Sequence, residues 1–159
     1  MEKTHKELMQ LAIDEARVTM NLDFGGPFGA LIVDKNGKIL AIASNTVLKD
    51  HDPTAHAEIN AIRKATQVLK SHDLSECILY TTAYPCPMCL GAIIWSNIKK
   101  VYYGCLESDA DSIGFRDDFI YKFIENKRLD INVLDLEEQE RDTCLTLFKE
   151  YNKKNKELY

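Results

Sequence analysis

Two short segments of the chain carry residue types that bind metal ions and move protons. They are His56-Ala57-Glu58 and Pro85-Cys86-Pro87-Met88-Cys89. One imidazole and two thiolates suit zinc, and a zinc ion with three protein ligands keeps a fourth position for water, as catalytic zinc sites do. Zinc lowers the pKa of that water, and a carboxylate two residues from a ligand can take its proton. The segments therefore predict zinc ligands His56, Cys86 and Cys89, and Glu58 as the catalytic acid and base.

Hydrolytic removal of an amino group from a heterocyclic base needs this set of residues. The pattern His-x-Glu followed by Pro-Cys-x-x-Cys is the sequence signature of zinc deaminases. In such a reaction the activated water attacks the amino-bearing ring carbon. Glu58 would then deliver protons to the ring nitrogen and to the leaving amine.

Each of these residues also has a simpler interpretation. A Cys-x-x-Cys pair alone is as often a structural zinc site or a redox pair as it is part of a catalytic site. A structural site needs a fourth protein ligand, and the sequence contains no second Cys-x-x-Cys segment. A redox pair would leave His56 and Glu58 without a role. The combination therefore favours a catalytic zinc centre.

The composition is that of an ordinary globular chain. With 159 residues, 45% of them hydrophobic and 28% charged, residues 1–159 are expected to form a single domain. No apolar stretch approaches the roughly 20 residues of a membrane span, and residues 1–7 lack the pattern of a signal peptide. We therefore expect no membrane partner and a cytoplasmic location, where the five cysteines are thiols or metal ligands.

The charge balance argues against a nucleic-acid partner. The formal net charge is −5 and the sequence pI is about 5.4, whereas binding to phosphates depends on clustered Lys and Arg. The one basic cluster is Lys149, Lys153, Lys154 and Lys156. We interpret it as the solvated end of a helix, where cations are favoured.

Apolar periodicity and turn residues predict alternating helices and strands. Helices are expected over 5–20, 53–70, 85–96 and 137–152, and strands over 30–33, 39–43, 77–82, 100–104 and 131–134. Asn36-Gly37 predicts a type I′ turn, which makes the first two strands antiparallel. Asp52 as N-cap with Pro53 following predicts the start of the second helix. The result is an α/β layered domain with a mixed sheet.

This order of elements places the zinc ligands at the starts of two helices. His56 would lie in the first turns of one helix, and Cys86 and Cys89 at the beginning of the next. A helix N-terminus favours anions, so it lowers the pKa of a thiol there and favours the thiolate that binds zinc.

Several segments resemble a known family. Gly26-Pro27-Phe28-Gly29-Ala30, the run from Asp52 to Glu58 and the run from Pro85 to Ala92 are similar to the cytidine-deaminase-like superfamily. The stretch from Gly114 to Tyr121 and the Lys-rich end with its terminal Tyr159 resemble its guanine and guanosine deaminase branch. Within the superfamily, the chain most closely resembles the small bacterial guanine deaminases.

The resemblance implies a three-layer α/β/α sandwich with a mixed five-stranded sheet, one Zn²⁺ per subunit, and conversion of guanine to xanthine and ammonia. It also implies a homodimer in which the C-terminal helical segment, 135–159, is exchanged and closes the partner's active site. The substrate contacts that it implies are Asn45, Ala57, Asp117, Trp95, Phe28 and Tyr159.

These contacts would have different roles. Asn45 would hydrogen-bond the base, and Asp117 would bind its ring N–H and amino edge. Trp95 and either Phe24 or Phe28 would pack on the ring, and Tyr159 would cap the pocket. Each has an alternative. Asn45 would be a turn residue, Asp117 an acid on the surface and the aromatic residues part of the core. Tyr159 would lie in a frayed chain end.

The chain also departs from this family. Ala83-Tyr84 precede Pro85, where guanine deaminases usually carry a glutamate beside the proline. Residues 137–151 do not match the group's C-terminal helix, so Glu137, Glu138 and Glu140 have no assigned role. Guanosine, cytosine or a pterin-like ring remain alternative substrates. A tRNA adenosine deaminase would need a basic surface, and a non-catalytic zinc-binding protein is the remaining alternative.

Overall fold

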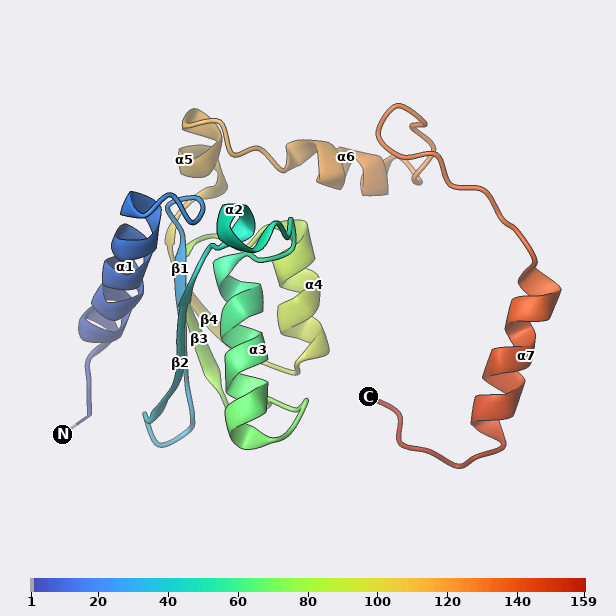
Figure 1. The fold of residues 1–159 in the computed structure, drawn as a ribbon, viewed down its shortest axis with the longest axis horizontal. Coiled ribbons are helices and arrows are strands. Elements are labelled where there is room, and N and C mark those ends of the chain that lie inside the picture. Colours follow the sequence, from blue (N-terminus) through green and yellow to red (C-terminus); the bar gives the residue numbers. More distant parts are fainter. Residues whose placement is uncertain (1) are drawn as a thin grey trace. The chain divides into compact units, whose positions relative to one another are not determined.

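The computed structural model describes residues 2–159, which form two compact units (Figure 1). One unit ends at Asp117 and the other is Asp118–Tyr159. The elements of the first unit are α1 (His5–Asn21), β1 (Gly29–Val33), β2 (Ile39–Ser44), α2 (Val47–Asp50), α3 (Ala57–Leu69), β3 (Ile78–Ala83), α4 (Pro87–Trp95), β4 (Lys100–Cys105) and α5 (Glu107–Ser112).

The strands of the first unit form one mixed sheet in the order β2-β1-β3-β4. β1 pairs antiparallel with both β2 and β3, and β3 pairs parallel with β4. The predicted α/β class with a mixed sheet is confirmed, but the prediction of five strands is wrong, because the sheet has four strands within residues 2–159.

The strand predicted at 131–134 is a turn in the structure. The main-chain N–H groups of Val133 and Leu134 donate to the carbonyl oxygen of Asp130, and that of Asn132 donates to the Asp130 carboxylate. The segment therefore satisfies its backbone locally, although its apolar residues suit a strand.

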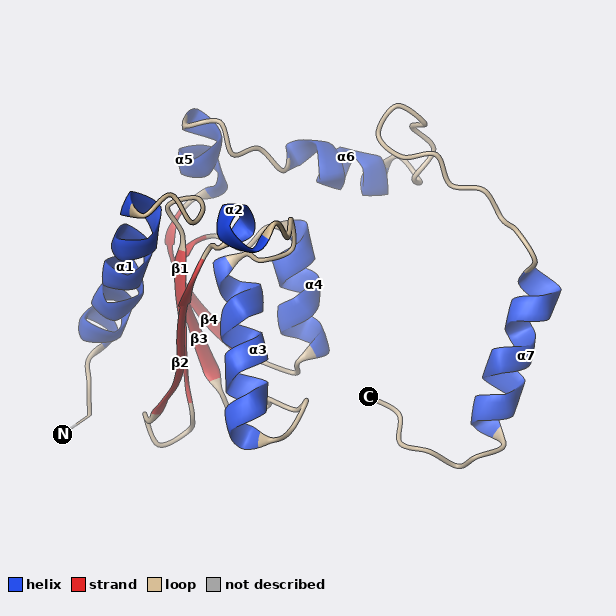
Figure 2. Ribbon diagram, in the orientation of Figure 1, coloured by secondary structure: helices blue, strands red, loops and turns tan. Residues whose placement is uncertain are grey.

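Helices cover both faces of the sheet, with α1 on one face and α3 and α4 on the other (Figures 1 and 2). Leu31 and Val33 of β1 pack with Leu8 and Ala12 of α1. Ala30 and Ile32 of β1 point to the other face. There they pack against a row of small residues on α3, namely Ala57, Ala61 and Ala65. A strand buried on both faces reads as a continuous apolar run, as Gly29–Val33 does.

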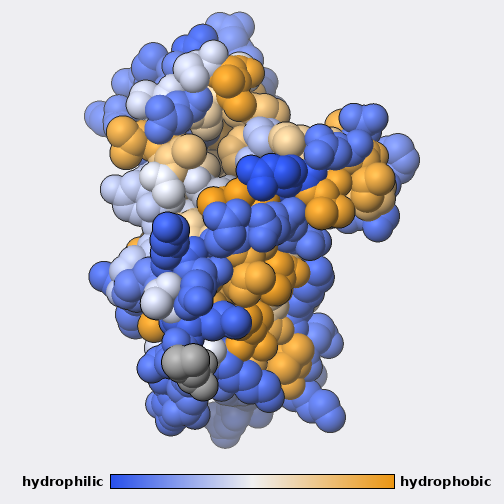
Figure 3. Space-filling view, turned by 90° about the vertical axis from the view of Figure 1, so that its left-hand side faces the viewer, coloured by the Kyte–Doolittle hydropathy of each residue, from blue (hydrophilic) through white to orange (hydrophobic). Residues whose placement is uncertain are grey.

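Local hydrogen bonds fix the start of α1. Thr4 accepts from the main-chain N–H of Glu7, and the Glu7 carboxylate accepts from the main-chain N–H of Thr4, which together form a capping box. Most residues that α1 turns away from the sheet are polar, with Val18 and Met20 as exposed exceptions. Figure 3 shows hydrophilic residues interspersed with apolar patches on this side. The helix therefore has one apolar stripe, which faces the sheet.

The hairpin between β1 and β2 is antiparallel as predicted, but its turn is not type I′. A type I′ turn needs a positive φ at both central residues, and here only Gly37 of the Asn36-Gly37 pair has one (+81°). The Asp34 carboxylate accepts from the main-chain N–H groups of Asn36 and Lys38, and the register shifts between Ile32 and Val33.

The second predicted helix begins later than Asp52. The Asp52 carboxylate accepts from the main-chain N–H and the hydroxyl of Thr54, both two residues on. Asp52 therefore closes a local turn instead of capping a helix, which is the competition that short polar side chains offer. α3 begins at Ala57, with His56 at its N-cap.

The second unit contains α6 (Asp118–Glu125) and α7 (Arg141–Asn152). The helix predicted from 137 starts only at Arg141, because Glu140 has a left-handed backbone with φ of +54°. Many of the unit's large apolar side chains are exposed, among them Phe119, Ile124, Leu129, Leu147 and Phe148. Within residues 2–159, no helix combines the length and apolar character that crossing a membrane requires.

Candidate active site

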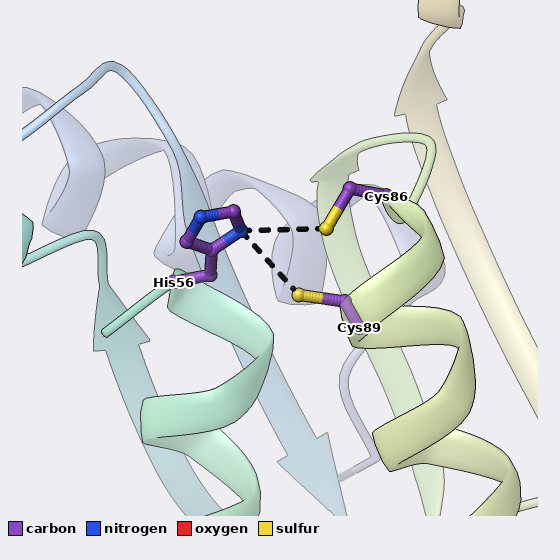
Figure 4. A group of neighbouring side chains, drawn as sticks. All are labelled: His56, Cys86 and Cys89. Atoms are coloured by element: carbon purple, nitrogen blue, oxygen red, sulfur yellow. Dashed lines mark hydrogen bonds between the residues drawn. The ribbon is translucent and has the colours of Figure 1, made fainter. Parts of the chain in front are cut away.

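Three potential metal ligands meet where two helices begin. His56 is the N-cap of α3, Cys86 is the N-cap of α4, and Cys89 lies in the first turn of α4. The imidazole points toward both sulfur atoms, with Nδ1 3.5 Å from Cys86 Sγ and 3.6 Å from Cys89 Sγ (Figure 4). Pro87 at the first helical position of α4 fits this geometry, because proline is favoured there and leaves the Cys-x-x-Cys turn regular.

These distances match a tetrahedral zinc ion. With Zn–N of about 2.0–2.1 Å and Zn–S of about 2.3 Å, a tetrahedral angle separates nitrogen from sulfur by about 3.6 Å. The three ligand atoms all lie within 4.8 Å of one another. Two sulfurs and one nitrogen are also the donor types that zinc prefers. The residues therefore fit zinc and leave its fourth position open.

The charges of the cluster are coupled through its hydrogen bonds. The bond from the Cys89 thiol lowers the pKa of Cys86 to about 4, and the imidazole of His56 adds to the effect. The same bond raises the pKa of Cys89. The hydrogen bond with Cys86 raises the pKa of His56, although burial opposes it. Without metal the cluster therefore holds protons that zinc must displace, because it binds thiolates and neutral imidazole.

Glu58 lies in the first turn of α3, two residues after the ligand His56. Its side chain is only 6% exposed, and burial raises the pKa of its carboxyl group. A raised pKa favours the protonated form of the carboxyl group, and a group that can both take and give a proton is what acid–base catalysis needs.

Two of the metal ligands, His56 and Cys86, line one cavity of about 630 Å³ together with Glu58, and Cys89 is buried behind them. Its walls come from the loop before β1, the β2–α2 connection, the starts of α3 and α4, and the chain from α5 to Asp117. The lining residues are Gly25, Gly26, Phe28, Asn45, Val47, Leu48, Pro53, His56, Glu58, Ala83, Tyr84, Cys86, Ala110, Gly114, Phe115, Arg116 and Asp117. A cavity of this size holds a small heterocycle.

The structure brings three of the predicted substrate contacts, Phe28, Asn45 and Asp117, to this cavity. Ala57 is fully buried beside it, at the first position of α3. Trp95 is at the opposite end of α4 from the cysteines and is 72% exposed, beside a separate shallow hollow. Tyr159 belongs to the second unit.

The orientation of Asn45 determines what it can offer to a ligand. Its Oδ1 accepts from the main-chain N–H of Val47 at 3.1 Å. A Cβ atom at Gly25 would overlap this Oδ1, so only glycine lets the loop before β1 approach so closely. With Oδ1 engaged, the amide Nδ2 is the group that Asn45 can present as a hydrogen-bond donor.

Sequence reasoning missed several residues of the cavity wall. Phe115 meets Phe28 edge to face at 5.0 Å between ring centroids, and Tyr84 meets Tyr103 in the same way. Phe115 lies within the stretch from Gly114 to Tyr121 that carried the family resemblance, which was the one available signal. Nothing local in the sequence marks Val47 or Leu48 as wall residues. Ala83 and Tyr84, the departure from the family beside Pro85, do line the cavity.

A sequence model of the cytidine and deoxycytidylate deaminase zinc-binding region matches residues 2–105, which include His56, Glu58, Cys86 and Cys89. The chain belongs to this family. A guanine deaminase of Bacillus subtilis (strain 168) is 50% identical over 121 residues, which cover 76% of this chain and 77% of the relative.

Two further relatives extend the comparison. The X-ray structure of guanine deaminase from Bacillus subtilis matches this structure with a TM-score of 0.90 and 41% identity, over 99% of each chain. A tRNA-specific adenosine deaminase of Haemophilus influenzae is 33% identical over 130 residues, covering 82% of this chain and 75% of that protein. The family therefore includes relatives that act on a free base and relatives that act on RNA.

Proposed function

We propose that the protein is a zinc-dependent deaminase that converts guanine and water to xanthine and ammonia. The observation that carries the proposal is the placement of a buried carboxylate, Glu58, beside a three-ligand zinc site in one cavity. The similarity to guanine deaminase over nearly the whole chain supports guanine as the substrate.

Each residue of the site has a defined part in this reaction. His56, Cys86 and Cys89 would hold the zinc ion, and the ion would supply an acidified water for the attack. Glu58 takes a proton from the attacking water, whose oxygen forms the new bond to the amino-bearing carbon. Glu58 then gives this proton to the adjacent ring nitrogen. It takes the second proton from the new hydroxyl group on the carbon and passes it to the amine, so that the carbon–nitrogen bond breaks and ammonia leaves.

Other residues of the cavity would bind and orient the base. Asn45 donates through Nδ2 to an acceptor on the ring, and Asp117 accepts from a ring N–H and the amino edge. Phe28 offers an aromatic surface, which Phe115 supports from its edge. The main chain at Ala57, at the start of α3, borders the metal site.

Removal of the Asn45 amide should weaken substrate recognition. For Asn45→Ala we expect kcat/KM for guanine to fall about tenfold, because a hydrogen bond to the base is worth about 0.5–1.5 kcal/mol and the Val47 N–H also loses its acceptor. Steady-state kinetics measure this. Asn36→Ala, in the exposed hairpin turn at the other end of β2, is the control and should keep wild-type kinetics. Equal kinetics for Asn45→Ala and wild type would remove Asn45 from the binding site.

The architecture of the complete enzyme is part of the proposal. Helices on both faces of the sheet support a three-layer α/β/α sandwich. The exposed apolar side chains of the second unit support a homodimer with exchanged C-terminal segments, in which Tyr159 of the partner subunit caps the site. Light scattering after gel filtration tests the dimer, and a monomer at working concentration would contradict it.

Substrate choice can be tested by ammonia release from guanine, guanosine, cytosine, adenine and a short tRNA hairpin. We expect turnover of guanine, and little or none of the hairpin, since the net charge of −5 does not favour RNA. Turnover of cytosine or a nucleoside in place of guanine would keep the zinc chemistry and overturn the assignment of the base.

A further inference from the structure

A half-buried amide on α3 connects the loop that carries Asn45 with the loop that carries His56. Asn60 Nδ2 lies 2.9 Å from the carbonyl oxygen of Ser44, 2.9 Å from Thr46 Oγ1 and 3.3 Å from the carbonyl oxygen of Ala55. One side chain on α3 therefore contacts two segments that are separated along the chain, one around Asn45 and one just before His56.

The three partners require a donor at this position. The carbonyl oxygens of Ser44 and Ala55 can only accept hydrogen bonds. The Thr46 hydroxyl donates to the Asp50 carboxylate at 2.6 Å, so its oxygen is left to accept as well. Only the nitrogen of the Asn60 amide can donate to them, with its two hydrogens shared among the three acceptors, which fixes the orientation of the amide.

The positions of these partners explain why the bridge matters. Ser44 and Thr46 flank Asn45 on both sides, so Asn60 holds the main chain around the amide that faces the cavity. Ala55 directly precedes His56, and the carbonyl oxygen of His56 accepts from the main-chain N–H of Asn60 at 2.9 Å. A main-chain bond from Thr46 to the carbonyl of Ala55, at 3.0 Å, joins the same two loops.

We propose that Asn60 is a positioning residue that sets the zinc ligand His56 and the base-binding Asn45 at a fixed separation. This rests on the proposed function for the role of Asn45, but not for the role of His56. Outer groups that orient metal ligands typically change metal affinity or activity about 10–100-fold when removed. A displacement of about 1 Å between a substrate-binding group and the reacting centre lowers the reaction rate by a comparable factor.

The alternative is that Asn60 only fills space, and two substitutions separate the interpretations. Asn60→Ala removes both volume and donor, whereas Asn60→Asp keeps the volume and faces three acceptor oxygens with a carboxylate. A positioning donor predicts that Asn60→Asp is impaired at least as much as Asn60→Ala. A space-filling residue predicts the reverse order. Asn60→Ser retains a hydroxyl donor and should recover part of the loss.

The experiment measures zinc affinity by competition with a chromogenic chelator, and kcat/KM for guanine, on variants whose folding is checked by circular dichroism. We expect Asn60→Ala and Asn60→Asp to lose about 10–100-fold in kcat/KM and to bind zinc more weakly. Gln67→Ala removes an exposed amide from the same helix and should stay within about twofold of wild type. In the Asn45→Ala background, Asn60→Ala should cost less in kcat/KM than in wild type.

The outcomes separate this proposal from the proposed function. Asn60→Asp with wild-type zinc affinity and kcat/KM would overturn the positioning role, and so would variants that lose only thermal stability. Weaker zinc binding in Asn60→Ala and Asn60→Asp, in a protein that turns over no guanine at all, would support the positioning of His56 and contradict the proposed function instead.

Discussion

Replacement of Glu58 by alanine or glutamine is expected to abolish guanine turnover while the protein still binds zinc. Proton transfer by a positioned side chain contributes about 10²–10⁴-fold to a rate. Glu58 would serve both in activating water and in protonating the leaving amine, so a loss of about 10³-fold or more in kcat is expected. The side chain is not a ligand in the His56, Cys86 and Cys89 cluster, so the metal site should survive its removal.

The measurement for this prediction combines steady-state kinetics with metal analysis of the purified variants. Glu76→Gln, which alters an exposed carboxylate paired with Lys35, is the matched control and should behave as wild type. A Glu58→Gln enzyme that retains zinc and works within about tenfold of the wild-type rate would show that another group moves the protons.

Removal of the metal is expected to stop the reaction and to destabilise the first unit. Extraction with a chelator leaves Cys86 and Cys89 sharing a proton next to His56, with no group to acidify water. Because zinc binds the folded site and not the unfolded chain, its loss should also lower the melting temperature. Activity and melting temperature should both recover when zinc is added back.

Cys89→Ser tests the same point through the protein. The residue is completely buried, and replacing its thiolate should reduce zinc to well below one ion per chain and abolish turnover. Cys144→Ser, at an exposed thiol in α7, is the control and should retain both. A zinc-free protein that still deaminates guanine would contradict the role of the metal altogether.

The parts of the site that were predictable from sequence are those encoded by residue type and short spacing. Cys86 and Cys89 are three residues apart, and a helix start brings such a pair to one ion. His56 and Glu58 are two residues apart at the start of α3, so a metal ligand and a carboxylate come close together there. The structure gathers the three ligands in one cluster, and His56, Cys86 and Glu58 line one cavity, as their chemistry requires.

Local competition between hydrogen bonds limited the prediction of the fold. Asp52 and Asp130 each close a turn on nearby main-chain N–H groups, and so displaced a predicted helix start and a predicted strand. Propensity favoured the helix and the strand, but a short carboxylate can satisfy the backbone at less entropic cost. These alternatives differ by a few hydrogen bonds, which residue patterns do not resolve.

The remaining residues act through contacts between segments far apart in the sequence. Phe115 reaches Phe28 across more than half the chain, and Asn60 bonds to Ser44 and Ala55 from a third segment. Asn60 looks like an ordinary polar position of α3 when only the sequence is considered. Its significance depends on the loops that the fold places beside it.

The most direct test of the central claim is the reaction of the zinc-loaded protein with guanine in water enriched in heavy oxygen. Hydrolytic deamination predicts equimolar ammonia and xanthine, with one heavy oxygen per xanthine molecule by mass spectrometry. No product, or xanthine without the label, would contradict the account of this site as a zinc-dependent guanine deaminase.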